Sequence, residues 1–241
     1  MSLKRLALKY LPGPILRPIR ARHYDSLLRD FPLTKEPDLL GCKALLSLGD
    51  TVLDVGANIG VYTRFCSQFV GGSGHVHSLE PIPETYSYLV RNVRSLGLNN
   101  VTCYNFAASD KDRDDAAMSM PEYSGGGANI YEARLSNDGN IPVKTTRLDT
   151  LFPNLSPRLI KCDVEGHEVE AIGGAREIIG RSRSHCLVEV KNLEAFDLFA
   201  SLGYEPFIWR QGKFLPKTAD DKALNYFFIA RENCSAIEGI S

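Results

Sequence analysis

The segment from Thr51 to Gly60 constrains the fold more than any other part of this chain. It reads T-V-L-D-V-G-A-N-I-G, and its apolar start predicts a buried strand with one acid, Asp54, near the end. Gly56 and Gly60 then turn the chain into an amphipathic, helix-like stretch over residues 61–70. Glycine allows a tight turn and a close ligand, and a helix start presents free N–H groups. The segment therefore predicts a cofactor site.

Size and composition fit one α/β domain with additions. The chain has 241 residues, of which 44% are hydrophobic and 24% charged, and its net charge of −1 gives no general attraction to nucleic acid. No apolar run is long enough to cross a bilayer. The six cysteines are scattered without a C-x-x-C pair, so we expect reduced core thiols, a cytoplasmic location and no clustered metal ligands.

Strand-like and helix-like segments alternate after residue 50. The expected strands are 51–55, 75–79, 101–107, 159–164 and 185–190, and the expected helices are 61–70, 83–96, 168–179 and 193–202. This alternation predicts a parallel sheet covered on both faces. Two further strand-like runs, 205–209 and 225–230, predict a terminal antiparallel pair.

The first forty residues form a basic arm ahead of the domain, which we place at 41–241. Six basic residues and no acid occur between Leu3 and Arg22. A short helix over 3–11 would lie on an anionic membrane surface, giving weak contact there. The alternative is an arm that packs on the domain or covers the mouth of its active site.

A polar excursion over residues 109–146 interrupts the alternation. It contains the run Gly125-Gly126-Gly127 and many turn residues, and loops of this length in compact domains are usually functional or disordered. The excursion follows the third strand, and open α/β sheets bind ligands beyond the carboxyl ends of their strands. It is therefore a candidate substrate flap, with a variable surface loop as the alternative.

A second acid strengthens the prediction of a cofactor site. Glu80 ends the second strand, 24 residues after Gly56, where a carboxylate can accept both hydroxyls of a ribose. The turn spacing is D-x-G-x-N-x-G, and Asn58 tolerates unusual backbone angles. The G-x-G-x-x-G spacing of nicotinamide-dependent oxidoreductases is missing, which disfavours that class.

Five ordered blocks resemble those of the FkbM family. They are D-V-G-A-N-I-G at 54–60, L-E-P at 79–81, A-A-S-D at 107–110, R-L-D-T-L at 147–151 and I-K-C-D-V-E-G-H-E at 160–168. The resemblance covers roughly residues 49–190. It implies a Rossmann-like class I methyltransferase fold, with a mostly parallel seven-stranded sheet and S-adenosyl-L-methionine as cofactor.

The resemblance also implies a role for each matching position. The implied cofactor residues are Asp54, Gly56, Ala57, Asn58, Gly60, Glu80, Pro81, Ala107 and Ala108. The glycine turn would line the methionine part of the cofactor, and Asp54 would orient its ammonium group directly or through water. Glu80 would hold the ribose, and the two alanines would flank the adenine. Cys162 stands where a larger aliphatic residue is common in the family, and His167 fills a position that varies.

Ionisable residues crowd the end of the fourth strand, and we name Lys161, Asp163, Glu165 and His167 as catalytic candidates. Methyl transfer to a hydroxyl needs an aligned acceptor and a base. His167 suits that role at neutral pH, and Asp163 or Glu165 would suit it if burial raised its basicity. Glu168 fits helix capping as well as chemistry.

Lys161 has two interpretations. It shares a strand face with Asp163, so it could pair with that carboxylate or anchor an acidic group of the substrate. Asp163, Glu165 and Glu189 also offer a plausible set of oxygen ligands for a divalent cation, but we expect no metal.

The sequence thus predicts an O-methyltransferase that acts on a hydroxyl of a sugar, a glycan or a secondary metabolite. The alternatives are a nitrogen acceptor and a non-catalytic binding protein with the same fold. The expected partner is a small molecule or glycan, not a nucleic acid.

Overall fold

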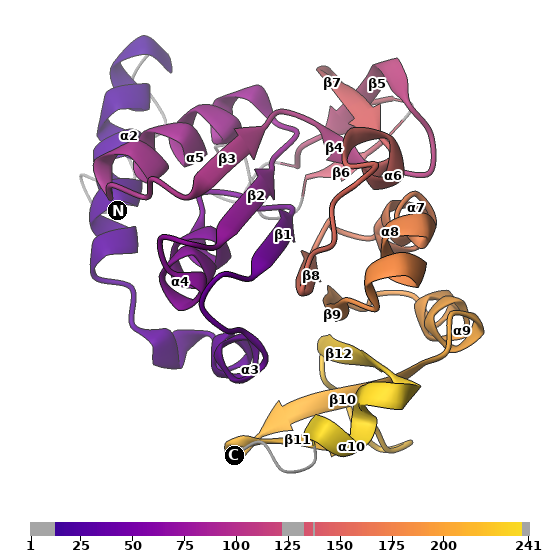
Figure 1. Ribbon diagram of the computed structural model, residues 1–241. Coiled ribbons are helices and arrows are strands. Elements are labelled where there is room, and N and C mark those ends of the chain that lie inside the picture. Colours follow the sequence, from indigo (N-terminus) through magenta and orange to yellow (C-terminus); the bar gives the residue numbers. More distant parts are fainter. Residues whose placement is uncertain (1–12, 122–132, 137, 238–241) are drawn as a thin grey trace.

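A computed structural model describes residues 13–121, 133–136 and 138–237 (Figure 1). The expected helix over 3–11 lies outside these residues. A sheet of eight strands has the order β11-β10-β12-β9-β8-β1-β2-β3. Five of the strands run parallel: β1 (Thr51–Val55), β2 (His75–Leu79), β3 (Val101–Tyr104), β8 (Leu159–Cys162) and β9 (His185–Glu189).

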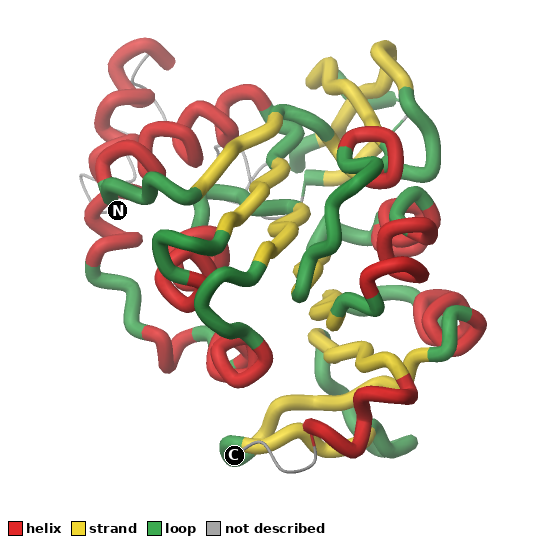
Figure 2. The backbone as a smooth tube through the Cα atoms, viewed as in Figure 1, coloured by secondary structure: helices red, strands yellow, loops and turns green. Residues whose placement is uncertain are grey.

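Helices cover both faces of this sheet, as Figure 2 shows by colour. One face packs against α3 (Asp38–Leu45) and α4 (Val61–Val70), and the other against α7 (Glu168–Gly173), α8 (Arg176–Ser182) and α9 (Glu194–Ser201). In β1, Val52 belongs to the apolar cluster on the first face and its neighbour Leu53 to the cluster on the second. A strand buried on both sides needs such a continuous apolar run, which is why the sequence shows one here.

The remaining described helices lie around this core. They are α2 (Gly13–Arg29), η1 (Leu33–Lys35), α5 (Pro83–Ser95), α6 (Leu148–Leu151), η2 (Arg231–Asn233) and α10 (Cys234–Ile237). Helix α2 packs against α5 at one edge of the molecule (Figure 1). In the described part of the chain, no helix is both long enough and apolar enough to cross a membrane.

The carboxyl-terminal strands differ from the expected antiparallel pair by one extra strand. Strands β10 (Tyr204–Arg210), β11 (Lys213–Pro216) and β12 (Asn225–Ala230) are antiparallel to their neighbours. Gln211 and Gly212, at φ 55° and 78°, form a two-residue hairpin turn, and Trp209 contacts Phe214 edge to face across it. The sheet therefore has eight strands rather than seven.

The expected strand 101–107 is divided between two sheets. The side chain of Asn105 donates to the carbonyls of Glu80 and Pro81, at 2.8 Å each, and so directs the chain away from β3. The next two residues form β4 (Ala107–Ala108), which pairs with β7 of a separate sheet.

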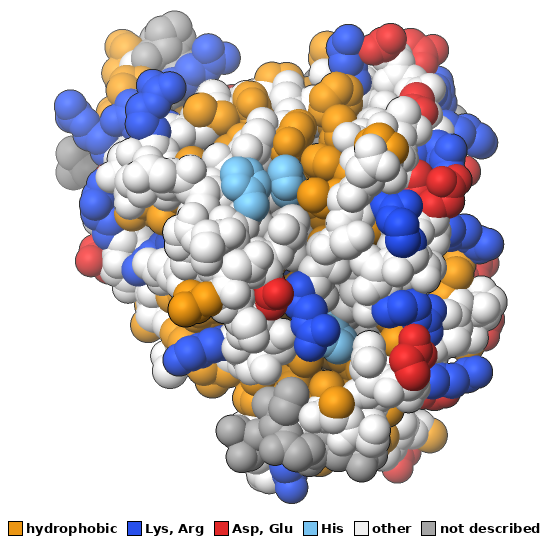
Figure 3. All heavy atoms as spheres, in the orientation of Figure 1, with side chains coloured by type: hydrophobic (Ala, Val, Ile, Leu, Met, Phe, Trp, Pro, Cys, Tyr) orange, Lys and Arg blue, Asp and Glu red, His pale blue; other side chains and the backbone are white. Residues whose placement is uncertain are grey.

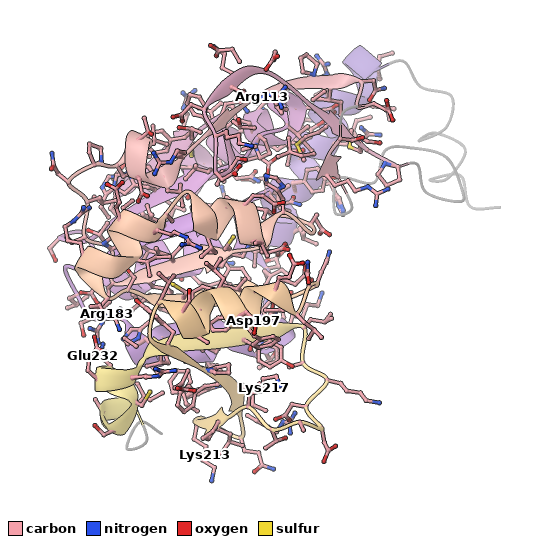
Figure 4. All side chains as sticks on the ribbon, turned by 90° about the vertical axis from the view of Figure 1, so that its right-hand side faces the viewer. Arg113, Arg183, Asp197, Lys213, Lys217 and Glu232 are labelled. Atoms are coloured by element: carbon pink, nitrogen blue, oxygen red, sulfur yellow. The ribbon has the colours of Figure 1, made fainter. Side chains whose placement is uncertain are left out.

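That second sheet contains the described part of the polar excursion. Its order is β4-β7-β5-β6, with β5 (Arg113–Ser119), β6 (Arg134–Leu135) and β7 (Ile141–Thr146). Met118 and Val143 pack there with Ile82 from the domain. In Figure 4 the sheet, marked by Arg113, lies at the opposite end of the molecule from Lys213 in β11. Residues 122–132 of the excursion are outside the described chain, so its role as a flap stays a prediction.

The expected helix 168–179 is two helices. A Cβ at Gly174 would lie 2.0 Å from the carbonyl oxygen of Ser109, so the chain bends where these backbones meet. The buried carboxylate of Asp149 then caps α8, accepting the N–H groups of Glu177 and Ile178 at 3.2 and 2.9 Å. This cap gives the R-L-D-T-L block a structural purpose.

At Gly56 the backbone just after β1 lies against the backbone just after β8. It has φ +79°, and a Cβ there would lie 1.8 Å from the carbonyl oxygen of Asp163, just after β8. We expect Gly56→Ala to lower the free energy of unfolding by at least about 2 kcal/mol, since both the backbone angle and the contact forbid a side chain.

Urea denaturation measures this change, and Gly180→Ala is the matched control. Gly180 lies in α8, and no atom comes within 4 Å of the position that a Cβ would take there, so alanine should raise stability by about 0.5–1 kcal/mol. Equal stability of the two variants would contradict the close approach at Gly56.

Candidate active site

A cavity of about 430 Å³ opens at the carboxyl ends of the parallel strands. Gly56 follows β1, Glu80 follows β2, Asp163 follows β8 and Glu189 ends β9, and all four line it. In the sheet, β1 lies between β2 and β8. The strand that follows β1 in the sequence is therefore on one side of it, and a strand from much later in the chain is on the other. This is the position at which open α/β sheets bind their ligands.

The glycine turn is held entirely by bonds within the protein. The N–H groups of Gly56 and Ala57 donate to the carbonyl of Leu79 at 3.0 and 2.8 Å, and that of Gly60 donates to Ala57. Asn58 has φ 51°, as its tolerance of left-handed geometry predicts, and its side-chain oxygen accepts the N–H of Ile59 at 2.8 Å. The free N–H groups expected in this sequence run are therefore not in the turn itself.

Glu80 lies against this turn with its carboxylate buried. One oxygen accepts the N–H of Asn58 at 3.0 Å, and the other accepts the N–H of Ile82 at 2.9 Å. Burial raises the pKa of Glu80 to about 7, although both N–H groups oppose the rise. Each oxygen keeps a second lone pair, so the group can still accept hydroxyl donors from a ligand.

Asp54 lies beneath the cavity and does not line it. The Thr63 hydroxyl donates to its carboxylate at 2.6 Å, and the Lys161 ammonium is 3.8 Å away. Burial raises the pKa of Asp54, with Lys161 and Thr63 opposing. The sequence suggested that Asp54 orients the ammonium group of a cofactor either directly or through water. A fully buried carboxylate fits only the contact through water.

Lys161 connects the two strands that flank the cavity. Its ammonium lies 3.1 Å from the carbonyl oxygen of Gly56 and 3.4 Å from the carboxylate of Asp163, as well as near Asp54. Burial lowers the pKa of Lys161, but the two carboxylates outweigh it and raise the pKa above its usual range. The side chain is therefore a charged ion-pair partner that also donates a hydrogen bond to the backbone of the glycine turn.

The three carboxylates considered as metal ligands do converge. Asp163, Glu165 and Glu189 each place one oxygen within 4.8 Å of the others. Lys191 forms an ion pair with Glu165 and, at 3.1 Å, with Glu189. Burial, followed by the charge of Asp163, raises the pKa of Glu189, while Lys191 opposes the rise. An ammonium group thus already supplies positive charge to this cluster.

His167 has a partner at each ring nitrogen. Nδ1 lies 3.4 Å from a carboxylate oxygen of Glu170, and Nε2 lies 3.0 Å from the Ser109 hydroxyl. With the Nδ1 proton directed at Glu170, Nε2 carries a lone pair. The neighbouring Glu168 has a structural role instead, because its buried carboxylate accepts the N–H groups of Val164 and Gly166 and so holds this corner of the chain.

All four catalytic candidates line the cavity, and so do most of the predicted cofactor residues. The lining includes Gly56, Ala57, Asn58, Glu80, Pro81, Ala107, Ala108, Lys161, Asp163, Glu165 and His167, but not Asp54 or Gly60.

Several residues of the cavity wall were not predicted from the sequence. Leu27, Phe31 and Glu36 come from the basic arm, and Tyr62, Leu187 and Asn225 also line the wall. No motif marks these positions, because only the tertiary packing brings them to the site. The described part of the arm therefore packs on the domain and reaches the cavity.

Comparisons with known proteins agree with this geometry. The family model of the methyltransferase FkbM domain matches residues 54–214. Among solved structures, methyltransferase FkbM from Methylobacillus flagellatus is similar at a TM-score of 0.51 and 16% identity, over 90% of this chain and 60% of that one. The Rossmann-like methyltransferase fold expected from the sequence is confirmed.

Curated proteins with similar sequences are also methyltransferases. The hexuronic acid methyltransferase AglP of Haloferax volcanii is 29% identical over 145 residues, which are 58% of this chain and 56% of AglP. A protein-L-isoaspartate O-methyltransferase of Ignicoccus hospitalis is 41% identical over 59 residues, or 24% of this chain and 28% of that protein. This chain thus spans about half the length of the first relative and less of the second.

The pKa of Glu80 gives a testable pH dependence. If its carboxylate accepts ribose hydroxyls, the ligand favours the ionised form, so affinity for S-adenosylhomocysteine should rise several-fold as pH increases from about 6 to about 8. Calorimetry at several pH values measures it. Glu80→Gln should bind more weakly and lose this pH dependence; a variant that retained it would assign the titration to another group.

Proposed function

Because the chain belongs to the FkbM family of S-adenosylmethionine-dependent methyltransferases, we propose that it methylates a hydroxyl group of a sugar or glycan. The observation that carries this proposal is the convergence of Glu80 and His167 on one cavity. The first offers a buried acceptor for ribose hydroxyls, and the second offers a base for an acceptor hydroxyl. The similarity to a hexuronic acid methyltransferase supports a sugar as the class of acceptor.

The residues of the cavity fit the proposed cofactor. Glu80 would hold the ribose, and the turn after β1 would lie along the methionine part. Ala107 and Ala108 are small, buried residues at the cavity wall, which leaves room for a flat ring beside them. When bound, the cofactor supplies an electrophilic methyl group, and the protein aligns the acceptor and receives its proton.

Among the candidate bases, His167 is the best placed. Asp163 is paired with Lys161, and Glu165 is paired with Lys191. Each of these two carboxylates is therefore already engaged by an ammonium group of the protein. The carboxylate of Glu170 instead faces Nδ1 of His167, where it orients the ring and stabilises the imidazolium that forms when Nε2 takes a proton. In the structure the hydroxyl of Ser109 occupies the position of a donor to Nε2.

Removing the imidazole should impair chemistry but not cofactor binding. We expect His167→Ala to lower kcat by about 10²- to 10⁴-fold, since the transition state loses its general base. Its affinity for S-adenosylhomocysteine should stay at the wild-type level.

The assay follows transfer of a labelled methyl group from S-adenosylmethionine to pooled neutral and acidic sugars, with mass spectrometry to find the gain of one methyl. His23→Ala, an exposed histidine of α2, is the control. Unchanged turnover in His167→Ala would remove the residue from catalysis, and transfer to no sugar at all would overturn the proposed acceptor class.

Metal removal gives a separate test of the acidic cluster. Because Lys191 already bridges Glu165 and Glu189, we expect methyl transfer to continue at the same rate after treatment with EDTA. Loss of activity in EDTA, with recovery on addition of Mg²⁺, would show instead that these carboxylates hold a cation.

A further inference from the structure

Charge is distributed very unevenly along this chain. Six of its 28 basic residues lie within the first 24 positions, which contain no acid. The remaining 217 residues carry 22 basic and 29 acidic residues. The amino-terminal part is thus strongly cationic, while the rest of the protein is anionic. Such a separation favours contact with an extended anionic surface through one side of the molecule only.

Helix α2 displays part of this charge at an edge of the molecule. Arg17, Pro18 and Ala21 line one side of a surface groove, and α5 supplies Arg91 and Arg94 on the other side. Figure 3 shows Lys and Arg side chains gathered along the edge of the molecule where Figure 1 places α2.

Most of these arginines are not neutralised by the protein. Arg20 pairs with Glu84, and Arg29 pairs with Asp25. Among the described residues, Arg17, Arg22, Arg91 and Arg94 form no ion pair, although the charge of Arg91 contributes to lowering the pKa of Asp25. The charges of Arg17, Arg22 and Arg94 have no acidic partner among these residues.

The outward face of α2 also carries apolar side chains. Ile15 and Ile19 are 50% and 51% exposed, and at a spacing of four residues they lie one above the other on the helix. Ala21 and Leu28, on the opposite face, are buried, and so is Leu16 on the flank. The interface of a bilayer offers an apolar layer for this pair as well as anionic groups for the arginines of the groove.

We propose that α2, together with the groove it forms with α5, docks on the surface of an anionic membrane. The arginines of the groove contact the phosphates of acidic lipids, and Ile15 and Ile19 enter the layer below the headgroups. At its other end α2 reaches the active-site cavity, which Leu27 lines. Docking would therefore bring the cavity close to the lipid surface, and the inference does not depend on the identity of the methyl acceptor.

Vesicle flotation with the full chain tests this docking. The protein should float with phosphatidylcholine vesicles that contain phosphatidylglycerol, but not with phosphatidylcholine alone, and salt should release it. Replacing Arg17, Arg91 and Arg94 by Gln should weaken binding by about 100-fold. The matched control replaces the exposed residues Arg176, Lys213 and Lys222 by Gln, which changes the net charge equally and should preserve binding.

A second pair of variants tests the apolar contact. Ile15→Ser with Ile19→Ser should weaken flotation, whereas Leu48→Ser with Leu193→Ser, at two residues that are each 77% exposed, should not. Absence of flotation, or equal losses in the Arg17, Arg91 and Arg94 variant and in its control, would overturn the proposal. So would a dimer in sedimentation that the Ile15 and Ile19 changes dissociate, because the face would then be a contact between copies of this chain.

Discussion

The ammonium group of Lys161 is the interaction on which this site depends. It lies between the carboxylates of Asp54 and Asp163 and contacts the carbonyl of Gly56, so one side chain joins the ends of β1 and β8. Such buried charges are costly unless each has a partner. Loss of the lysine would leave Asp54 buried and unpaired except for Thr63. The ion pairs thus add side-chain contacts to the backbone pairing of β1 and β8 at the mouth of the cavity.

Around this joint, each neighbouring feature limits the next. The backbones of Gly56 and Asp163 come so close that no side chain fits at residue 56. The turn that follows places Asn58 against Glu80, and Asn105, just after β3, donates a hydrogen bond to the carbonyl of Glu80. On the other side, Glu168 holds the corner that presents His167. The positions of the acid and of the imidazole are therefore set by backbone contacts rather than by flexible loops.

Much of this arrangement could be predicted from the sequence, because its signals are local. An apolar run ending in D-x-G-x-N-x-G predicts the strand and the turn. Glu80 could be predicted as a ligand-binding residue because it is the acid at the end of the next strand. Strand alternation likewise placed Lys161 and Asp163 on one face. The predictions failed where a distant contact decides: Gly174 meets Ser109 and divides a helix, and Asn105 ends a strand early.

Other features had no local signal at all. The contributions of Phe31 and Glu36 to the cavity depend on how the basic arm folds back, which no spacing in the sequence reveals. The partner of Glu165 is Lys191, from the segment after β9, and the pairing arises only from the order of strands in the sheet. Asp149 was expected only as part of the R-L-D-T-L block that resembles the family. The structure shows that its carboxylate caps helix α8.

The saturated hydrogen bonding of the glycine turn has a thermodynamic consequence. Because the N–H groups from Gly56 to Gly60 already have acceptors within the protein, this segment needs no partner to become ordered. A ligand entering here loses little of its binding free energy to freezing the backbone. The turn is thus preorganised, and its selectivity is determined by how well a ligand fits the fixed shape of this backbone.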